Sequence, residues 1–462
     1  MKPKIEFKPE LIKRYDKAGP RYTSYPTANL FDESFTADDY RDAASRSNQQ
    51  ENPKPLSLYF HIPFCDTVCF YCACNKIVTK RRERAIPYLE NLFKEIAMQG
   101  ELFDRSRPVD QLHWGGGTPT FLSHQQMRSL MEKTGQHFSL LSDDQGEYSI
   151  EIDPREITAE GVHFLRDIGF NRISLGIQDF DPQVQQAVNR IQGEDITYAA
   201  INAAREAHFK SVSVDLIYGL PLQTVESFLS TLEKIMQVSP DRLSIFNYAH
   251  LPTLFMPQRR ISENDLPSAA VKLEILQAAI SYLADQGYVY VGMDHFARPE
   301  DELVVAQDKG LLHRNFQGYS THADCDMVAM GVTAISQVGN IYSQNTRDEE
   351  SYYQMLDENR LPIMRGMILN DDDLLRRSLI SYLICNFKLD MNKFAKEHGI
   401  DFKSYFENEI DRLQEMQEDG LVKIEGSELT VLPAGRLLIR NICMIFDAYL
   451  GDNQKSRFSK VI

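Results

Sequence analysis

Four cysteines within ten residues are the side chains of this sequence best suited to binding a metal. Cys65, Cys69 and Cys72 form a CxxxCxxC triad, and Cys74 follows two positions later. Thiolates bind soft metals and iron–sulfur clusters, and each iron of a [4Fe–4S] cube needs a ligand from outside the cube. Three thiolates from one loop can therefore serve three irons, which leaves the fourth iron open to a small molecule.

Two other interpretations of these cysteines compete with the cluster. All four could form a structural zinc site, but such sites usually take two pairs of ligands from separated segments, and Cys72 and Cys74 are too close together to bind one ion comfortably. They could also be inert thiols of the core, although free thiols rarely gather so densely. The spacing favours the iron–sulfur cluster over both.

More polar and glycine-rich motifs follow, end or lie on short apolar runs. They are the run Gly115-Gly116-Gly117-Thr118-Pro119, the carboxylates Glu151 and Asp153, Gln178, Asp215, and the run Tyr248-Ala249-His250. Consecutive glycines allow backbone groups to approach a ligand closely. The glycine run is neither a P-loop nor a GxGxxG fingerprint, and a plain tight turn is the alternative.

The elements that must position these motifs are six apolar runs bounded by Gly, Pro and Asp, which we predict to be strands. They are Leu56–Ile62, Val109–Trp114, Tyr148–Ile152, Arg172–Gly176, Val212–Ile217 and Arg242–Phe246. Amphipathic helical stretches separate them, which predicts crossover connections and a parallel sheet. We predict an α/β fold with an incomplete parallel (β/α)6 barrel, and a flat doubly wound sheet is the alternative. Active sites of parallel barrels lie at the carboxyl ends of the strands, where all these motifs fall.

We predict three domains: an N-terminal extension over residues 1–50, a catalytic barrel over 51–364 and a mostly helical C-terminal domain over 365–462. The extension is polar and irregular, and it could close over the site as a lid. In the C-terminal domain we expect helices over Asp371–Phe387, Met391–His398, Phe402–Glu418 and Arg436–Leu450, and a hairpin of Leu421–Glu425 with Leu429–Leu432. Helices with a small hairpin resemble a winged-helix module.

The overall composition restricts the partners and the compartment. The 462 residues carry a formal net charge of −16, which repels nucleic-acid phosphates and anionic membranes. There is neither a targeting segment nor an apolar run of the ~18 residues that a membrane span needs, so we expect a cytoplasmic protein. Seven cysteines, an odd number, argue against a disulfide framework.

Several longer motifs extend the pattern over nearly the whole chain. They are His61–Cys65 with Cys74, Trp114–Thr120, Gln178–Phe180, Asp215–Pro221, Phe246–His250 and Asn315–Tyr319, together with Arg21–Thr27 and Arg440–Cys443. With the CxxxCxxC triad, they make the sequence resemble the oxygen-independent coproporphyrinogen III oxidases, a haem-biosynthesis family of the radical S-adenosylmethionine (radical SAM) superfamily. The barrel is the fold that this resemblance implies.

The resemblance implies cluster ligands and cofactor contacts. Cys65, Cys69 and Cys72 would hold the [4Fe–4S] cluster. The residues implied in binding S-adenosylmethionine are Tyr71, Gly116, Gly117, Thr118, Glu151, Gln178, Arg190, Asp215 and Ala249, while Tyr59, Gly116, Ile335, Phe316 and Gln317 match positions near a second such molecule. Glu151 could accept hydrogen bonds from an ammonium group, Arg190 could pair with a carboxylate, and Asp215 could bind ribose hydroxyls. No catalytic acid or base is implied.

The implied reaction is an anaerobic oxidative decarboxylation. One electron from the cluster would cleave S-adenosylmethionine into methionine and a 5′-deoxyadenosyl radical, which takes hydrogen from the β-carbon of a propionate. Loss of carbon dioxide and one electron would leave a vinyl group, and two rounds would convert coproporphyrinogen III to protoporphyrinogen IX. The partners expected are this tetrapyrrole and a reducing electron-donor protein, and we expect a monomer.

Other members of the superfamily provide the competing functions: a haem-degrading methyltransferase, or a haem-binding chaperone without turnover. Cys74 and the C-terminal motif favour the oxidase. The substrate's four carboxylates need cations, for which Arg21, Arg298 and Arg314 are the candidates. His61, His250 and His295 are either proton-handling groups or core histidines, and Cys325, Cys385 and Cys443 are expected to be buried apolar thiols.

Overall fold

The computed structural model describes residues 5–142, 144–322 and 325–450, and the chain divides into two compact units. The barrel unit comprises Phe31–Ile275 and Asp324–Ile368. The helical unit comprises Met1–Leu30, Leu276–Ala323 and Leu369–Ile462. The predicted boundaries of the three domains stay a prediction.

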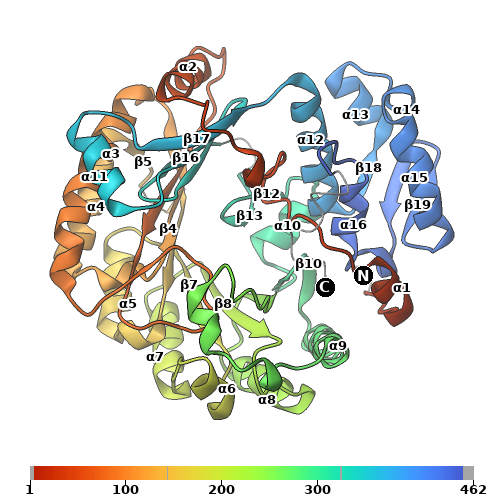
Figure 1. Cartoon of the computed structure of the whole chain (residues 1–462), viewed down its shortest axis with the longest axis horizontal. Helices are drawn as coiled ribbons and strands as arrows, with labels where there is room; N and C mark the ends of the chain where they lie inside the picture. Colours follow the sequence, from red (N-terminus) through yellow and green to blue (C-terminus); the bar gives the residue numbers. More distant parts are fainter. Residues whose placement is uncertain (1–4, 143, 323–324, 451–462) are drawn as a thin grey trace. The chain divides into compact units, whose positions relative to one another are not determined.

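A large sheet with parallel strands forms the barrel unit (Figure 1). Its strands run in the order β9-β8-β7-β6-β4-β1-β14-β15-β16-β17, parallel from β9 to β14 and antiparallel from there on. The bounds are β1 Leu56–Ile62, β4 Pro108–Gly116, β6 Glu147–Ile152, β7 Arg172–Gln178, β8 Ser211–Tyr218, β9 Arg242–Asn247, β14 Asp326–Met330, β15 Ile335–Val338, β16 Ile341–Asn345 and β17 Ile363–Ile368, with the short strands β2 Phe64–Cys65, β3 Ile77–Val78 and β5 Ser139–Leu140. All six predicted strands are confirmed in their parallel order.

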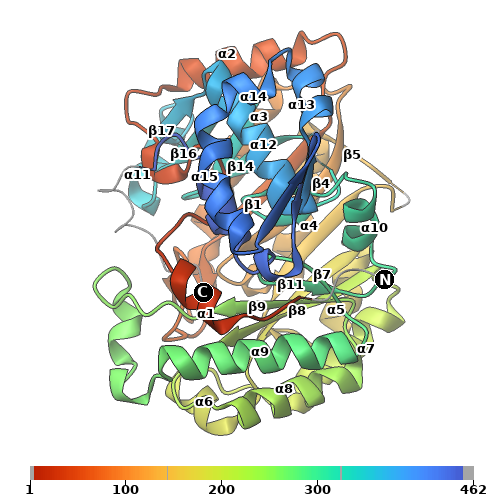
Figure 2. The same cartoon turned by 90° about the vertical axis from the view of Figure 1, so that its right-hand side faces the viewer.

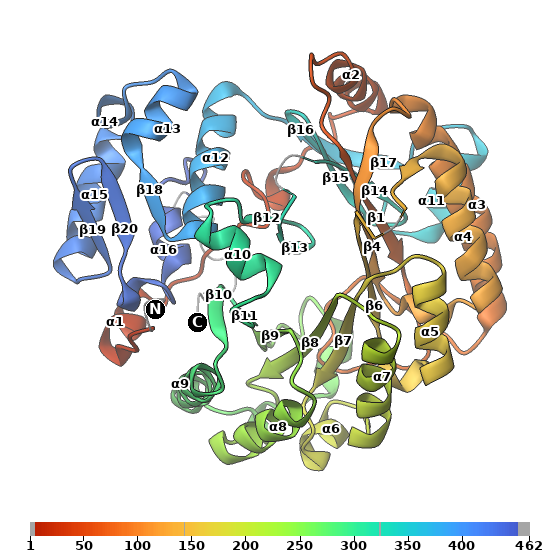
Figure 3. The same ribbon diagram turned by 180° about the vertical axis from the view of Figure 1, so that it is seen from behind.

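Helices pack along the outer side of this sheet (Figure 3). They are α2 Ala37–Asn48, α3 Ala85–Leu102, α4 His124–His137, α5 Ala159–Asp167, α6 Pro182–Ala187, α7 Glu194–Glu206, α8 Val225–Val238 and α11 Glu349–Asp357, while α9 Ala269–Asp285 spans the boundary between the units. The central strand β1 is buried on both faces, with Leu58, Phe60 and Ile62 wholly inaccessible, as is usual for a strand of a parallel sheet covered by helices. Capping boxes begin several helices; in α4, Ser123 and Gln126 cap each other.

The strands from β14 onward were not predicted. They are only four to six residues long, and no helix separates β14, β15 and β16, so they lack the alternating pattern that identified the others. Asp326 begins β14 and forms a buried ion pair with Arg107, at 2.6 Å between Oδ2 and Nη2. This pair fixes β14 beside β1 at the amino ends of the strands, away from the ends where the site lies.

The helical unit is built from short helices, two small sheets and one antiparallel pair of strands (Figure 2). Its bounds are α1 Pro9–Tyr15, β10 Val289–Gly292, β11 His295–Ala297, α10 Glu302–Asp308, β12 His313–Asn315, β13 Gly318–Ser320, α12 Asp371–Asn386, β18 Lys388–Asp390, α13 Met391–His398, α14 Phe402–Tyr405, α15 Glu407–Glu418, β19 Val422–Glu425, β20 Glu428–Val431 and α16 Ile439–Met444. The predicted hairpin is present as β19 and β20, and β18 adds a third strand to it.

Two predicted helices were wrong in extent. The segment Phe402–Glu418 is divided at Phe406, whose backbone is not helical. The last helix covers only Ile439–Met444 instead of Arg436–Leu450. The carbonyl groups of Ile445 and Phe446 accept hydrogen bonds from the guanidinium groups of Arg412 and Arg376, each at 2.9 Å, so side chains replace the helical partners there.

The first fifty residues are more regular than predicted. They contain α1 and α2, and α2 begins with a capping box between Thr36 and Asp39. Arg440 of α16 donates hydrogen bonds to the carbonyl oxygens of Gly19 and Pro20. Residues 5–30 thus belong to the helical unit while α2 belongs to the barrel unit, and the action of the extension as a lid stays a prediction. Across the described residues, no helix has the length and apolar character to cross a bilayer.

Candidate active site

The cysteine loop leaves the sheet at the carboxyl end of β1 and is closed by its own short sheet. Phe64 and Cys65 of β2 pair with Ile77 and Val78 of β3, which brings the two ends of the loop together. The middle of the loop is fixed by Asn189, whose side-chain amide donates to the Val68 carbonyl at 2.8 Å. The pairing of β2 with β3 and the hydrogen bond from the distant Asn189 thus hold the loop that carries the three thiols.

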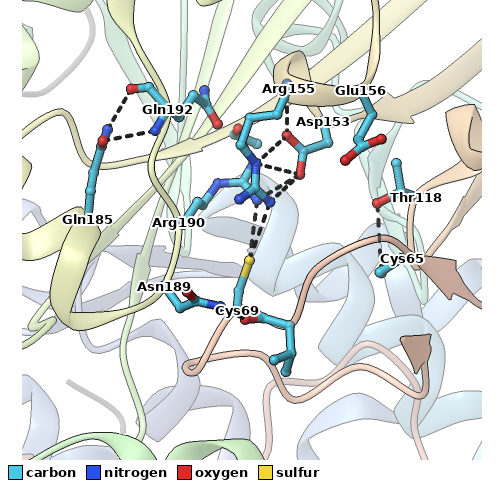
Figure 4. Close-up of polar contacts among 12 residues, drawn as sticks. Cys65, Cys69, Thr118, Asp153, Arg155, Glu156, Gln185, Asn189, Arg190 and Gln192 are labelled. Atoms are coloured by element: carbon cyan, nitrogen blue, oxygen red, sulfur yellow. Dashed lines mark hydrogen bonds and ion pairs between the residues drawn. The ribbon is translucent and has the colours of Figure 1, made fainter. Parts of the chain in front are cut away.

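Two guanidinium groups lie against the sulfur of Cys69 (Figure 4). Arg190 Nη1 is 3.5 Å and Arg155 Nη2 is 3.6 Å from its Sγ. Both also donate to Oδ2 of Asp153, at 3.0 and 2.7 Å. Burial opposes ionisation of Asp153, but the two arginines outweigh it and hold the pKa of this carboxyl below its usual range. One carboxylate between two guanidiniums leaves positive charge beside the sulfur, which favours a thiolate ligand.

The other thiols also have defined partners. The Thr118 hydroxyl donates to Cys65 Sγ at 3.7 Å, although burial is the larger effect and raises the pKa of Cys65 to about 12. Cys74 hydrogen-bonds to Cys72, which lowers the pKa of Cys72 to about 6 and raises that of Cys74. In this arrangement Cys74 hydrogen-bonds to Cys72, which is one of the three predicted cluster ligands.

The glycine run is packed so closely that side chains are excluded. A Cβ on Gly117 would lie 2.6 Å from the Phe64 carbonyl oxygen, and one on Gly116 would lie 2.6 Å from the His61 ring. Gly116 also has a φ of +112°, which L side chains rarely adopt. The Gly117 amide donates to the Ile62 carbonyl at 2.8 Å. The run is therefore a backbone surface fitted against the cysteine loop, and the alternative of a plain tight turn does not account for this packing.

Glu151 connects the glycine run to the aromatic side chains of neighbouring strands. Its carboxylate accepts from the Gly116 amide at 3.2 Å and lies 3.3 Å from His113 Nε2. Burial raises the pKa of Glu151, but the hydrogen bond and charge of His113 and the Gly116 amide outweigh burial and lower it overall. The His113 ring stacks on Tyr59, with centroids 5.8 Å apart, and the Tyr59 hydroxyl lies 3.2 Å from His61 Nδ1.

Gln178 ends β7, and Asp215 lies within the neighbouring strand β8. Asp215 accepts a hydrogen bond from the Ser174 hydroxyl at 3.2 Å, and burial together with the negative charge of Glu151 raises its pKa to about 6. Gln178 has a φ of +71°, which turns the chain at the end of β7. Arg190 Nη2 donates to the Gly176 carbonyl at 2.5 Å and so fixes this turn to the Cys69 environment.

A buried glutamine joins the remaining predicted residues of the barrel. Gln258, which is 1% exposed, donates from Nε2 to the carbonyls of Tyr71 and Ala249, at 3.0 and 3.3 Å. The Tyr71 ring packs against a hydrophobic cluster that includes Val188 and Tyr248. Burial is the largest influence on Tyr71 and raises its pKa.

Four residues of the site were missed in the sequence: His113, Arg155, Asn189 and Gln258. His113 and Arg155 carried a signal, since His113 directly precedes the Trp114–Thr120 motif and Arg155 lies two residues after Asp153. Asn189 and Gln258 carried none, because their roles come from tertiary contacts with backbone groups.

The remaining predicted residues are divided between the barrel unit and the helical unit. Ile335 begins β15 of the barrel unit, whereas Phe316 and Gln317 form the turn between β12 and β13 of the helical unit. Their place near a second S-adenosylmethionine stays a prediction. Cys385 and Cys443 are buried as predicted, but Cys325 is only half-buried because it directly precedes β14.

The candidate histidines lie in different surroundings. His61 is buried, which lowers its pKa, and its Nε2 lies 3.1 Å from the Asn75 carbonyl oxygen. His250 Nδ1 lies 2.8 Å from the Tyr248 hydroxyl. In the helical unit, His295 packs edge-on against Tyr319.

Comparisons with known proteins decide the family. A model described as the Radical SAM superfamily matches residues 59–235, and one described as the HemN C-terminal domain matches residues 369–438. The oxygen-independent coproporphyrinogen III oxidase of Pseudomonas aeruginosa is 51% identical, covering 99% of both chains, and that of Escherichia coli is 50% identical with the same coverage. The chain belongs to the oxygen-independent coproporphyrinogen III oxidases. The solved structure of the Escherichia coli coproporphyrinogen III oxidase (HemN), a radical SAM enzyme, matches with a TM-score of 0.92 and 48% identity, over 97% of this chain and 100% of that chain.

The residues present fit the cofactors of this oxidase family. Three thiols on one closed loop provide the ligands of a [4Fe–4S] cluster, which favours this cluster over structural zinc. Arg190 is 6% exposed, and its Nε has no hydrogen-bond partner within the described ranges. One buried donor of this arginine is thus available to an anionic group such as the carboxylate of S-adenosylmethionine. The tightly packed glycine run provides the close backbone approach that such a ligand needs.

Proposed function

We propose that this chain catalyses the oxygen-independent oxidative decarboxylation of two propionate side chains of coproporphyrinogen III, giving the vinyl groups of protoporphyrinogen IX. Close identity over 99% of two curated relatives carries this proposal, and the complete environment of the cysteine triad supports it. When bound, the cluster and S-adenosylmethionine supply the one-electron chemistry that generates the hydrogen-abstracting radical.

The chain's own residues position these groups. Cys65, Cys69 and Cys72 hold three irons, while Arg155 and Arg190 stabilise the negative charge on the Cys69 sulfur. The Gly117 backbone, Glu151 and Arg190 orient the amino-acid end of S-adenosylmethionine.

The rest of the cofactor is oriented from neighbouring strands. Asp215 binds the ribose hydroxyls, and Tyr71 stacks on the adenine. The hydrophobic cluster behind Tyr71 excludes water from the reactive centre, which protects a radical from side reactions. A reducing electron-donor protein and a monomeric state complete the proposal.

An anaerobic turnover assay tests the function. The reconstituted protein receives a reductant, S-adenosylmethionine and coproporphyrinogen III, and 5′-deoxyadenosine and oxidised porphyrins are quantified together. We expect both deoxyadenosine and protoporphyrin, and neither from a Cys69→Ala variant. Deoxyadenosine without protoporphyrin would keep the radical chemistry and reject the substrate. Absence of both products with an intact cluster would favour a haem-binding chaperone.

A further inference from the structure

A buried arginine of the β12–β13 hairpin has no acidic partner among the residues that the structure describes. Arg314 lies opposite Tyr319 in the hairpin register, and its guanidinium is 5.2 Å from the centre of the Tyr319 ring. The residue is only 8% exposed, yet its Nε and Nη1 have no hydrogen-bond partner in the part of the chain that the structure describes. Burying an unpaired charge costs several kcal/mol, so this arrangement needs an explanation outside packing.

More positive charge surrounds Arg314 within the helical unit. Arg440 is 3% exposed, and burial lowers its pKa to about 10, with further lowering by the nearby charges of Arg21 and Arg314. Asp294 is the carboxylate that acts on Arg440, and it is already paired with Arg21 at 2.5 Å. Asp294 thus acts on both Arg21 and Arg440, and Arg440 also donates to the carbonyl oxygens of Gly19 and Pro20, whereas Arg314 keeps two donors without a partner among the described residues.

Aromatic rings and a fourth arginine extend the cluster. Gly292 brings the rings of Tyr319 and Phe387 together, since a Cβ at this position would lie 2.4 Å from the Tyr319 hydroxyl and 3.2 Å from Phe387 Cζ. Arg436 stacks on Phe387 at 4.5 Å, and its buried Nε likewise has no partner within the described residues. Unpaired guanidinium donors beside flat rings suit a flat ligand that carries several carboxylates.

We propose that Arg314, supported by Arg436 and Arg440, binds a propionate carboxylate of the tetrapyrrole substrate. This inference rests on the proposed function, which supplies a substrate with four carboxylates. Of the three arginines that the sequence indicated, Arg21 is occupied by Asp294, and Arg298 donates to the Gln286 carbonyl. Arg314 is the one whose buried donors remain available, and a guanidinium can bind a carboxylate through two parallel hydrogen bonds.

The test measures binding without turnover. The reconstituted full-length protein is titrated with coproporphyrin III, the oxidised tetracarboxylate, and separately with its uncharged tetramethyl ester. We expect Arg314→Met to weaken coproporphyrin III binding about 10- to 100-fold, because a hydrogen-bonded charge pair is lost, and to leave ester binding unchanged. The matched control is Arg412→Met, which removes an exposed arginine of the same unit that donates to the Ile445 carbonyl. This control should bind both probes like the wild type.

Thermal unfolding separates binding from a structural role. Removing an unpaired buried charge should leave the melting temperature of the ligand-free Arg314→Met protein unchanged or raise it. A lower melting temperature, with equal losses for the acid and the ester, would overturn the inference. So would wild-type affinity for coproporphyrin III in the folded variant.

A second substitution and the turnover assay complete the test. Arg314→Lys keeps the charge without the planar guanidinium and should bind coproporphyrin III with intermediate affinity. If Arg314→Met fails to fold, wild-type affinity of the Arg314→Lys protein overturns the inference. A wild-type protein that turns over coproporphyrinogen III while Arg314→Met binds normally rejects only this inference. A wild-type protein that neither binds the porphyrin nor turns over the substrate rejects the proposed function as well.

Discussion

Replacing Asp215 by Asn should stabilise the protein while weakening its affinity for S-adenosylmethionine. Asp215 lies on β8, where burial and then the charge of Glu151 raise its pKa from the ordinary 3.8 to about 6. The charged carboxylate is therefore held in surroundings that disfavour it, as is common at functional sites. Asparagine keeps an acceptor for the Ser174 hydroxyl and removes the charge.

The pKa shift sets the size and the sign of the effect. A shift of about two units corresponds to at most about 3 kcal/mol, and partial access of water to this half-buried side chain reduces that to about 1–2 kcal/mol. Because the pKa is raised in the folded state, the stability cost is fully present above pH 6 and disappears as the pH falls through 6 toward 4. The variant should thus exceed the wild type in stability at pH 8 and lose most of that advantage at pH 4.5.

The assay compares melting temperatures of the reconstituted proteins at both pH values under anaerobic conditions, without S-adenosylmethionine. Asp241→Asn is the matched control, because Asp241 accepts from the Val212 amide at 2.8 Å in the same sheet. Affinity for S-adenosylmethionine at pH 8 should fall about 10- to 100-fold in Asp215→Asn, since charge-assisted hydrogen bonds are lost. A variant less stable than the wild type at pH 8, or one with an equal gain at both pH values, would refute the reasoning.

Three further substitutions test the glycine run, the arginine pair and the fourth cysteine. Gly116→Ala places a Cβ 2.6 Å from the His61 ring at a φ of +112°, so we expect a loss of at least about 1–3 kcal/mol and weaker S-adenosylmethionine binding; an unchanged melting curve would contradict the close packing. Arg155→Met removes an N–H group 3.6 Å from Cys69 Sγ. A loss of about 1 kcal/mol for one electron should make the reduction midpoint of the cluster about 45 mV more negative, measured by a redox titration followed by electron paramagnetic resonance. An unshifted midpoint would show that Arg155 does not act on the sulfur. Cys74→Ser should retain the full iron and sulfide content, whereas loss of the cluster would make Cys74 a ligand.

The sequence predicted the parallel sheet because its six strands alternate with amphipathic helices and end at motifs of unusual composition. Leu56–Ile62 has the same bounds in the prediction and in the structure, because a mostly apolar segment directly before a cysteine loop is readily identified as a strand. The shorter strands from β14 onward gave no such pattern. Their position depends on the buried pair of Arg107 and Asp326, which lie more than two hundred residues apart in sequence.

The residues of the candidate site also form two groups, one that the sequence predicted and one that it did not. Side chains expected to contact a cofactor directly, such as Glu151 and Asp215, could be found because they are acidic residues on otherwise apolar strands, Glu151 near the end of β6 and Asp215 within β8. The side chains that support them could not, because Gln258 and Asn189 act by donating to backbone carbonyls of distant segments. A hydrogen bond to a carbonyl oxygen imposes no residue type on its partner, so it leaves no motif in the sequence.

The net charge of the chain does not describe its individual sites. A formal charge of −16 describes the solvated surface, whereas the groups that recognise an anion are buried and few. Beside Cys69, two arginines share Asp153, and in the helical unit Arg314 has two guanidinium donors with no hydrogen-bond partner among the described residues. In both sites these groups lie where water is scarce and Coulomb interactions are strong. Anion recognition at the two sites that we propose therefore depends on the local balance of charges and not on the net charge of the chain.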